Sequence, residues 1–135
     1  MESLKWSEKY SVGVQEIDIQ HRGLLDTINQ IIDSIVKGNE WETTSRIVDS
    51  LINYAYHHFS TEERLMKQVG YSELDSHIEL HLDFIKKISG FAQETAISNS
   101  ELQREMLKYV TTWYSNHVLG IDRKYIACFS AKGIK

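Results

Sequence analysis

The segment HFSTEERLMKQVGYSELDSHIELH, residues 58–81, decides the fold of this chain. On each side of Gly70 it carries two polar residues, of types that can bind metals, four positions apart. Side chains four residues apart lie on one face of an α-helix, and glycine often follows a helix end. The segment therefore predicts two helices with a short connection, which makes them antiparallel and brings both pairs to one level. The pairs are His58 with Glu62 and His77 with His81.

Outside this segment, apolar residues recur at helical spacing in two further stretches, which gives four amphipathic helices in all. No sustained alternation of apolar and polar residues competes with them, and the chain has no proline. We predict an all-α protein, an antiparallel up-down-up-down four-helix bundle with an N-terminal arm and a short C-terminal helical tail. Residues 1–135 would form a single domain, with the arm at 1–16 and bundle helices at 17–37, 40–66, 72–96 and 101–118.

Composition narrows the classes of partner. The chain has 135 residues, 41% of them apolar and 25% charged, which is ordinary for one soluble domain. Its net charge is −4 and no basic run stands out, so nucleic acid and anionic membranes are poor partners. No stretch approaches the roughly 20 apolar residues that span a bilayer, and the start of the chain lacks a secretory signal. We expect a cytoplasmic protein without nucleic-acid binding or membrane insertion.

Histidines from all four predicted helices fall at one end of the bundle. His21 lies near the start of the first helix, and His117 lies near the end of the fourth. The pairs around Gly70 stand at the same level, because neighbouring helices run antiparallel. Burying so many imidazoles and carboxylates without partners would be costly, so we expect a buried metal cluster. The candidate ligands are His21, His58, Glu62, His77, His81, His117 and Asp122.

Each motif alone is weaker evidence for a metal site than the whole set of candidate ligands. One histidine pair at helical spacing is more often incidental than a ligand pair, and His57 falls outside the pattern, either in solvent or beside a ligand. Asp122 follows His117 by five residues, which an ideal helix would place about 140° out of line. Gly120 stands between them, and a distorted turn or π-bulge there would bring Asp122 back to the site.

The number and type of the candidate ligands narrow the choice of metal. Seven nitrogen and oxygen ligands are too many for one tetrahedral zinc, and they suit two ions that share carboxylate bridges. Imidazole favours iron, copper, nickel and zinc over magnesium or calcium. The chain contains neither His-Glu-x-x-His nor Glu-x-x-His, which argues against a metalloprotease and against a ferritin-like site.

These residues resemble the hemerythrin family, and most closely the single-domain bacteriohemerythrins. The resemblance runs from Trp6 to about Tyr125. The matching segments are Val12-Gly13-Val14, Ile17-Asp18, Gln20-His21, His58-Phe59-Ser60-Thr61-Glu62-Glu63, Leu65-Met66, Gly70-Tyr71, His77 with His81, and Trp113 through His117 to Asp122.

The resemblance implies a cofactor of two iron ions, Fe²⁺ or Fe³⁺, with an oxo or hydroxo bridge and O₂ as ligand. Glu62 and Asp122 would bridge the ions, and His21 with His58 would hold the iron that has an open position. The other iron, coordinatively saturated, would take His77, His81 and His117. It also implies an apolar O₂ pocket lined by Leu24, Phe59, Trp113, Tyr114 and Val118.

Reversible O₂ binding for storage, transport or delivery, rather than enzyme activity, is the function that this resemblance implies. An unidentified protein could receive the O₂. Two alternatives use the same site: a di-iron redox enzyme (a peroxidase, an oxidase or an NO-handling protein) and an O₂ sensor. Sensors of this type usually carry an attached signalling domain, for which 135 residues leave no room.

Tyr114 departs from the family pattern, which usually has an apolar residue, often leucine, after the tryptophan. Its hydroxyl could donate to bound dioxygen, which would slow release or support peroxide chemistry and thus the enzyme alternative. It could instead turn to a helix interface with its hydroxyl in solvent. Both interpretations are open at this point.

Overall fold

A computed structural model of the protein describes residues 4–94 and 100–135, and its regular elements are helices throughout this part of the chain. Four long helices account for most of it, and shorter helical turns precede and follow them. In chain order the elements are η1 (Glu8–Tyr10), α1 (Gln15–Val36), α2 (Trp41–Val69), α3 (Leu74–Glu94), α4 (Ser100–Trp113), η3 (Tyr114–Val118), η4 (Ile121–Tyr125) and α5 (Ile126–Ala131).

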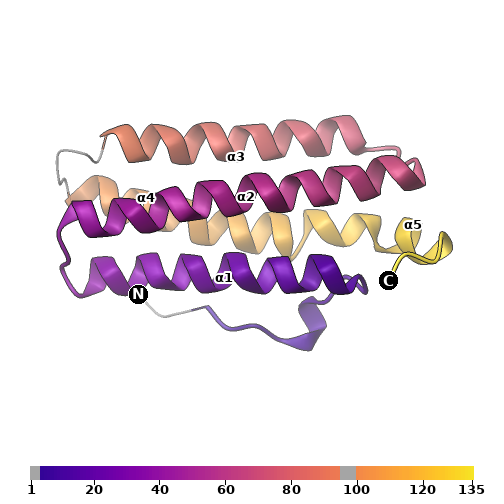
Figure 1. The fold of residues 1–135 in the computed structure, drawn as a ribbon, viewed down its shortest axis with the longest axis horizontal. Coiled ribbons are helices and arrows are strands. Elements are labelled where there is room, and N and C mark those ends of the chain that lie inside the picture. Colours follow the sequence, from indigo (N-terminus) through magenta and orange to yellow (C-terminus); the bar gives the residue numbers. More distant parts are fainter. Residues whose placement is uncertain (1–3, 95–99) are drawn as a thin grey trace.

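The four long helices form an antiparallel bundle (Figure 1). Helix α1 packs against α2, α2 against α3, α3 against α4, and α4 closes the bundle against α1. The start of α1, the end of α2, the start of α3 and the end of α4 meet at the end where the chain terminates (Figure 1). The predicted all-α, up-down-up-down topology is confirmed, and its candidate ligands gather at this end.

Helix bounds differ from the predicted ones by a few residues. Helix α2 continues to Val69, whose side chain is buried, and stops where Gly70 takes a left-handed conformation with φ +69°. Helix α1 begins at Gln15, before the predicted start. The predicted fourth helix ends as an α-helix at Trp113, because the chain continues as a π-helical turn. The predicted end of the third helix at residue 96 lies outside the described residues.

Two apolar clusters fill the interior. The larger occupies the body of the bundle between all four long helices. The smaller lies at the end of the bundle, where the N-terminal arm and the C-terminal tail cover it. The buried members of this end cluster are Val12, Val14, Ile17, Leu65, Met66, Val69, Tyr125 and Phe129.

The N-terminal arm runs beside α1 and is tied to it by polar contacts (Figure 1). The side-chain amide of Asn29 exchanges two hydrogen bonds with the backbone of Leu4, at 2.8 and 2.9 Å. Asp18 accepts hydrogen bonds from the Ser11 hydroxyl and from the Val12 backbone amide. These contacts hold Val12 and Val14 over the end of the bundle.

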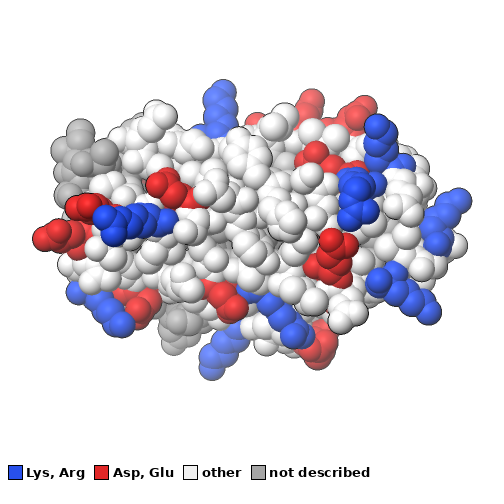
Figure 2. All heavy atoms as spheres, viewed as in Figure 1, with Lys and Arg blue, Asp and Glu red and all other residues white. Residues whose placement is uncertain are grey.

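None of the helices in the described part of the chain has an apolar run long enough to cross a membrane. Lysines and arginines are interspersed with aspartates and glutamates over the face drawn in Figure 2.

Candidate metal centre

All seven candidate ligands lie in one buried layer between the two apolar clusters. Along α1, His21 stands between Ile17 of the end cluster and Leu24 of the main core. Helix α2 repeats this order in reverse, since His58 and Glu62 separate its core residues from those of the end cluster. Each of the seven residues is at most 3% exposed.

Glu62 stands at the centre of this layer and faces two groups of histidines. Its Oε1 lies 2.8 Å from His77 Nε2 and 3.1 Å from His81 Nε2. Its Oε2 lies 3.1 Å from His58 Nε2 and 3.6 Å from His21 Nε2. One carboxylate thus presents one oxygen to each group.

Asp122 repeats this arrangement from the opposite side of the bundle. Its Oδ1 lies 3.0 Å from His77 Nε2 and 3.1 Å from His117 Nε2, and its Oδ2 lies 3.1 Å from His21 Nε2. The donor atoms therefore form two sets, each with all atoms within 4.8 Å of one another, that share both carboxylates. One set is Glu62, His77, His81, His117 and Asp122, and the other is His21, His58, Glu62 and Asp122.

The chain after α4 is distorted, as the spacing of His117 and Asp122 requires. In the π-helical turn η3, the Leu119 amide donates to the Tyr114 carbonyl oxygen at 3.3 Å, five residues back. The 3₁₀-helix η4 then begins at Ile121, with Asp122 in its first turn. A Cβ atom on Gly120 would lie 2.5 Å from the Asn116 carbonyl oxygen, so the turn needs glycine here. The distortion carries Asp122 back to the side of His117.

Contacts within the layer shift the pKa values of its carboxylates and of His21. Burial alone would raise the pKa of Glu62, but the charge of His58 and hydrogen bonds from several histidines hold it well below its usual value. The pKa of Asp122 is also lowered, because His117 and His21 outweigh burial and the charge of Glu62. Burial disfavours the charged form of His21, yet its contacts with Asp122 and Glu62 raise its pKa to about 9. Both carboxylates are therefore ionised in the interior.

The donor atoms fit metal ions better than they fit one another. Among the described residues, a few buried side-chain nitrogen and oxygen atoms make no hydrogen bond, and most of these belong to His21, His117 and Asp122. Such atoms are costly unless something else coordinates them. Imidazole nitrogen with carboxylate oxygen is a donor set that iron accepts. The two sets sharing two carboxylates fit a pair of ions bridged by Glu62 and Asp122.

Three contacts to the cluster were not predicted from the sequence. Gln20 Oε1 lies 2.8 Å from His58 Nδ1, and Glu63 Oε2 lies 2.7 Å from His81 Nδ1. Tyr125 donates its hydroxyl hydrogen to Glu62 Oε2 at 3.0 Å. The first two contacts turn the Nε2 atom of each ring towards the cluster. The available sequence signal is position alone, since each of these residues stands within three places of a candidate ligand.

His57, which the helical pattern excluded, is exposed. Its Nε2 lies 3.4 Å from the side-chain nitrogen of Gln20. It thus lies beside a residue that contacts a candidate ligand, at the outer edge of the cluster.

The expected pocket residues surround the cluster unequally. Leu24, Phe59, Tyr114 and Val118 are buried, and Trp113 is half-buried. The Phe59 ring stacks on His81, with centroids 3.8 Å apart, and the Trp113 ring stacks on His117 at 4.7 Å. These two aromatic side chains therefore lie against the three-histidine group.

Tyr114 packs into the interface with α1, but its hydroxyl is not in solvent. The side chain is 2% exposed, and its hydroxyl donates to the His21 carbonyl oxygen at 3.1 Å. Burial, with a smaller effect of Asp122, raises the pKa of this phenol above its usual value. The expectation of a wet hydroxyl is wrong, because the ring spans the gap between the two helices and reaches the backbone of α1.

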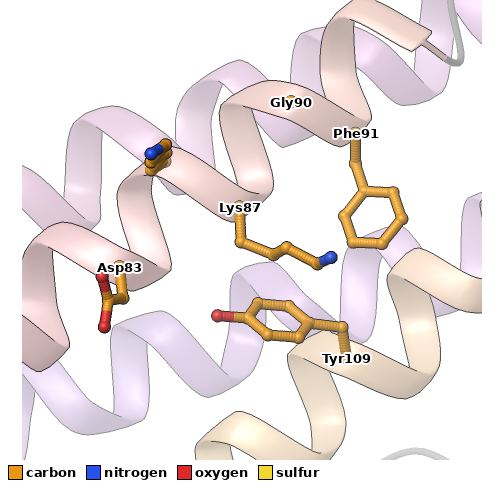
Figure 3. Close-up of a pocket in the computed structure, with 6 residues that line it drawn as sticks. Asp83, Lys87, Gly90, Phe91 and Tyr109 are labelled. Atoms are coloured by element: carbon orange, nitrogen blue, oxygen red, sulfur yellow. The ribbon is translucent and has the colours of Figure 1, made fainter.

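Two grooves that are lined by described residues open between α3 and the chain of α4 and η3. One, of about 460 Å³, holds the Lys87 ammonium 5.2 Å from the centre of the Phe91 ring and contains none of the candidate ligands (Figure 3). The other has a volume of about 350 Å³. It is lined by Leu80, Tyr109, Thr112, Trp113, Asn116, His117 and Ile121. The candidate ligand His117 therefore lies in the wall of this second groove.

Comparisons of the sequence and of the structure with known proteins point to the same family. A sequence model described as the hemerythrin HHE cation binding domain matches residues 12–129. A bacteriohemerythrin of Clostridium acetobutylicum is 32% identical over 125 residues, which cover 90% of this chain and 97% of that protein. A myohemerythrin of Theromyzon tessulatum is 30% identical and covers 92% of both chains. The crystal structure of a wild-type hemerythrin superposes with a TM-score of 0.82 at 25% identity, over 96% of this chain and 99% of the other.

Proposed function

This chain belongs to the hemerythrin family, and from that premise we propose that it binds O₂ reversibly at a non-haem di-iron centre. The observation that carries the proposal is the pair of carboxylates, each of which turns one oxygen to either histidine group. An O₂ store or carrier, rather than an enzyme, is the role that we assign to it.

In this proposal the two histidine groups hold one iron each. His77, His81 and His117 would hold one iron together with the two carboxylates, which makes five protein groups. His21 and His58 would hold the other together with the same carboxylates, which makes four, and this smaller set would leave room for O₂. When bound, the ferrous pair supplies the two electrons that O₂ takes up on binding and returns on release.

The surrounding side chains favour reversible binding over turnover. Leu24, Phe59 and Val118 are buried, and together with the main core they keep water from the site. The Tyr114 hydroxyl, the sequence feature that supported an enzyme, is already donated to the His21 carbonyl oxygen. This contact takes up the hydrogen that peroxide chemistry would need from Tyr114.

An anaerobic reconstitution with Fe²⁺, followed by cycles of O₂ and argon, tests the proposal. We expect two irons per chain and a visible charge-transfer band that appears under O₂ and disappears under argon. Rapid, irreversible oxidation in the first cycle would contradict a reversible carrier.

The adjacent residues His57 and His58 provide matched variants for the same experiment. His58→Ala removes a ligand of the open iron, and we expect it to lower the iron content and abolish the reversible band. His57→Ala changes an exposed histidine outside both donor sets, and we expect it to keep two irons. Equal iron content in the two variants would contradict the ligand assignment.

A further inference from the structure

Tyr125 is a buried phenol at the end of η4 that contacts the centre of the metal layer. It is 0% exposed, and its hydroxyl donates to Glu62 Oε2 at 3.0 Å. The ring packs on Phe129 with centroids 4.5 Å apart and meets Tyr71 edge-on at 6.3 Å. Apolar contacts therefore hold the ring, and a single polar contact directs the hydroxyl to a candidate ligand.

The 3₁₀ geometry of η4 explains why the hydroxyl arrives there. In a 3₁₀-helix, side chains three residues apart lie on the same face. Asp122 and Tyr125 therefore both point into the bundle. Asp122 reaches the histidines directly, and Tyr125, one turn later, reaches the second carboxylate on α2. One short turn thus controls both bridging groups.

The contact is asymmetric with respect to the two iron sets. Tyr125 donates to Oε2 of Glu62, the oxygen that lies nearest His58 and His21. The other oxygen, Oε1, faces His77 and His81. Hydrogen bonds to an ionised carboxylate are strong and directional, so this contact fixes the rotation of the carboxylate plane. The effect of this contact should fall mainly on the set that contains His21 and His58, which we call the two-histidine set.

We propose that Tyr125 is a positioning residue of this centre, which holds Oε2 of Glu62 towards His21 and His58 and thereby secures the iron of the two-histidine set. This inference rests on the proposed di-iron function. It adds a residue outside both donor sets that acts on one of the two ions and not on the other.

The variant Tyr125→Phe tests this proposal because it removes the hydroxyl and keeps the ring packing. Tyr71→Phe is the matched control. It deletes the same atom at the same end of the bundle, where the Tyr71 hydroxyl donates to the exposed Glu73 at 3.1 Å. Both variants and the wild type are loaded with Fe²⁺ without O₂, and iron transfer to an excess chelator is followed over time.

We expect two irons per chain in all three proteins and a two-phase release. In Tyr125→Phe the faster phase, one iron per chain, should accelerate about tenfold, the lower end of the usual effect of removing a residue that orients a ligand. The slower phase should keep the wild-type rate, and Tyr71→Phe should match the wild type in both phases. Selective acceleration is the signature of positioning, because a general loosening of the fold would release both ions faster.

Three results would overturn the inference. Wild-type release rates in Tyr125→Phe would show that the hydroxyl does not matter, and equal acceleration of both phases would show a general structural role. A phenolate-to-Fe³⁺ absorption band in the oxidised wild type that is absent from Tyr125→Phe would make Tyr125 a ligand instead. If the wild type binds no iron, the proposed function fails and this inference fails with it. Wild-type binding of two irons separates the two cases.

Discussion

Gln20 is a buried residue outside both donor sets that orients one of the candidate ligands, His58. Its Oε1 accepts a hydrogen bond from His58 Nδ1 at 2.8 Å, and its nitrogen lies 3.2 Å from the Thr61 hydroxyl oxygen. Gln20→Leu removes the acceptor and frees the imidazole to rotate. We expect iron in the two-histidine set to bind about 10- to 100-fold more weakly, as measured by competition with a chelator.

A control for this prediction comes from the same small network. Thr61→Val keeps the side-chain volume and leaves the contact between Gln20 and His58 in place. It removes the contact to the Gln20 nitrogen and the hydrogen bond that the Thr61 hydroxyl donates to the His57 carbonyl oxygen, so we expect a much smaller loss of iron affinity. Equal losses in the two variants would mean that the network as a whole, rather than the contact to His58, governs metal binding.

The ring and the hydroxyl of Tyr114 make separable contributions. Tyr114→Phe loses the hydrogen bond to the His21 carbonyl oxygen, which should cost about 1 kcal/mol of the free energy of unfolding. Tyr114→Leu also leaves unfilled core volume, so it should cost more, about 2 kcal/mol or above. Urea unfolding of the metal-free proteins measures both values.

Autoxidation of the iron-loaded variants gives a second measurement at this position. Because the hydroxyl is committed to α1, we expect Tyr114→Leu, which removes the ring, to change the autoxidation rate more than Tyr114→Phe does. If the Phe variant changed the rate as much as the Leu variant, the hydroxyl would have to leave the carbonyl and act on bound O₂.

At the residue scale, the sequence predicted the candidate ligands because helical periodicity and antiparallel order are enough to bring them to one level. It did not predict the partners of these ligands. Gln20, Glu63 and Tyr125 contact them through particular rotamers across helix interfaces, and spacing along one helix does not determine those rotamers. Tyr114 shows the same difficulty, since its two sequence interpretations differ only in where a single hydroxyl points.

At the scale of elements, the turn from η3 to η4 places the second bridging carboxylate. Gly120→Ala would put a Cβ atom 2.5 Å from the Asn116 carbonyl oxygen, which belongs to the backbone and cannot move aside alone. We expect the turn to shift and Asp122 to leave its position between the two histidine groups. The iron content of the purified, reconstituted variant should fall below two per chain.

Gly90→Ala is the matched control for this element. Gly90 lies within α3, and apart from its chain neighbours and the adjacent backbone of the same helix, no described atom lies within 4 Å of a Cβ built on it. Alanine in a helix interior is more favourable than glycine by about 1 kcal/mol, so this variant should be at least as stable as the wild type and keep both irons. Full iron content in Gly120→Ala would show that the turn tolerates the added methyl group.

The need for a distorted turn was predictable, because two ligands five positions apart do not share one face of an ideal helix. The length of the distorted segment was not predictable, because the π-helical turn already begins at Tyr114, well before Asp122, the residue that the distortion brings to the site. Helix ends were predicted to within a few residues where glycine stops them, as at Gly70. Burial of a side chain such as Val69 extends a helix beyond its sequence pattern.

At the scale of the whole molecule, the bundle topology followed from four amphipathic segments with short connections. The division of the interior into two apolar clusters did not, because it depends on how the arm and the tail fold over the end. Asp18 holds the arm through Ser11 and Val12, and Arg123 on η4 donates to the Lys9 and Ser11 carbonyl oxygens. Arm and tail therefore depend on one another, and both adjoin the metal layer.

This arrangement predicts that metal removal loosens one end of the protein before the rest. The metal layer separates the main core from the end cluster, and ions bound to Asp122, to His117 on η3 and to the candidate ligands on α1, α2 and α3 would link the two. Without them, buried carboxylates and imidazoles face one another with poor hydrogen bonding, while the main core keeps its contacts.

We expect metal-free protein to keep its helical circular dichroism, to melt at a lower temperature, and to exchange the backbone amides of residues 121–131 faster. Amides in the middle of α1 and α2, which pack in the main core, should stay protected until global unfolding. Native-state hydrogen exchange on the loaded and metal-free forms measures this difference, and a uniform increase over all helices would mean that the metal stabilises the bundle as one unit.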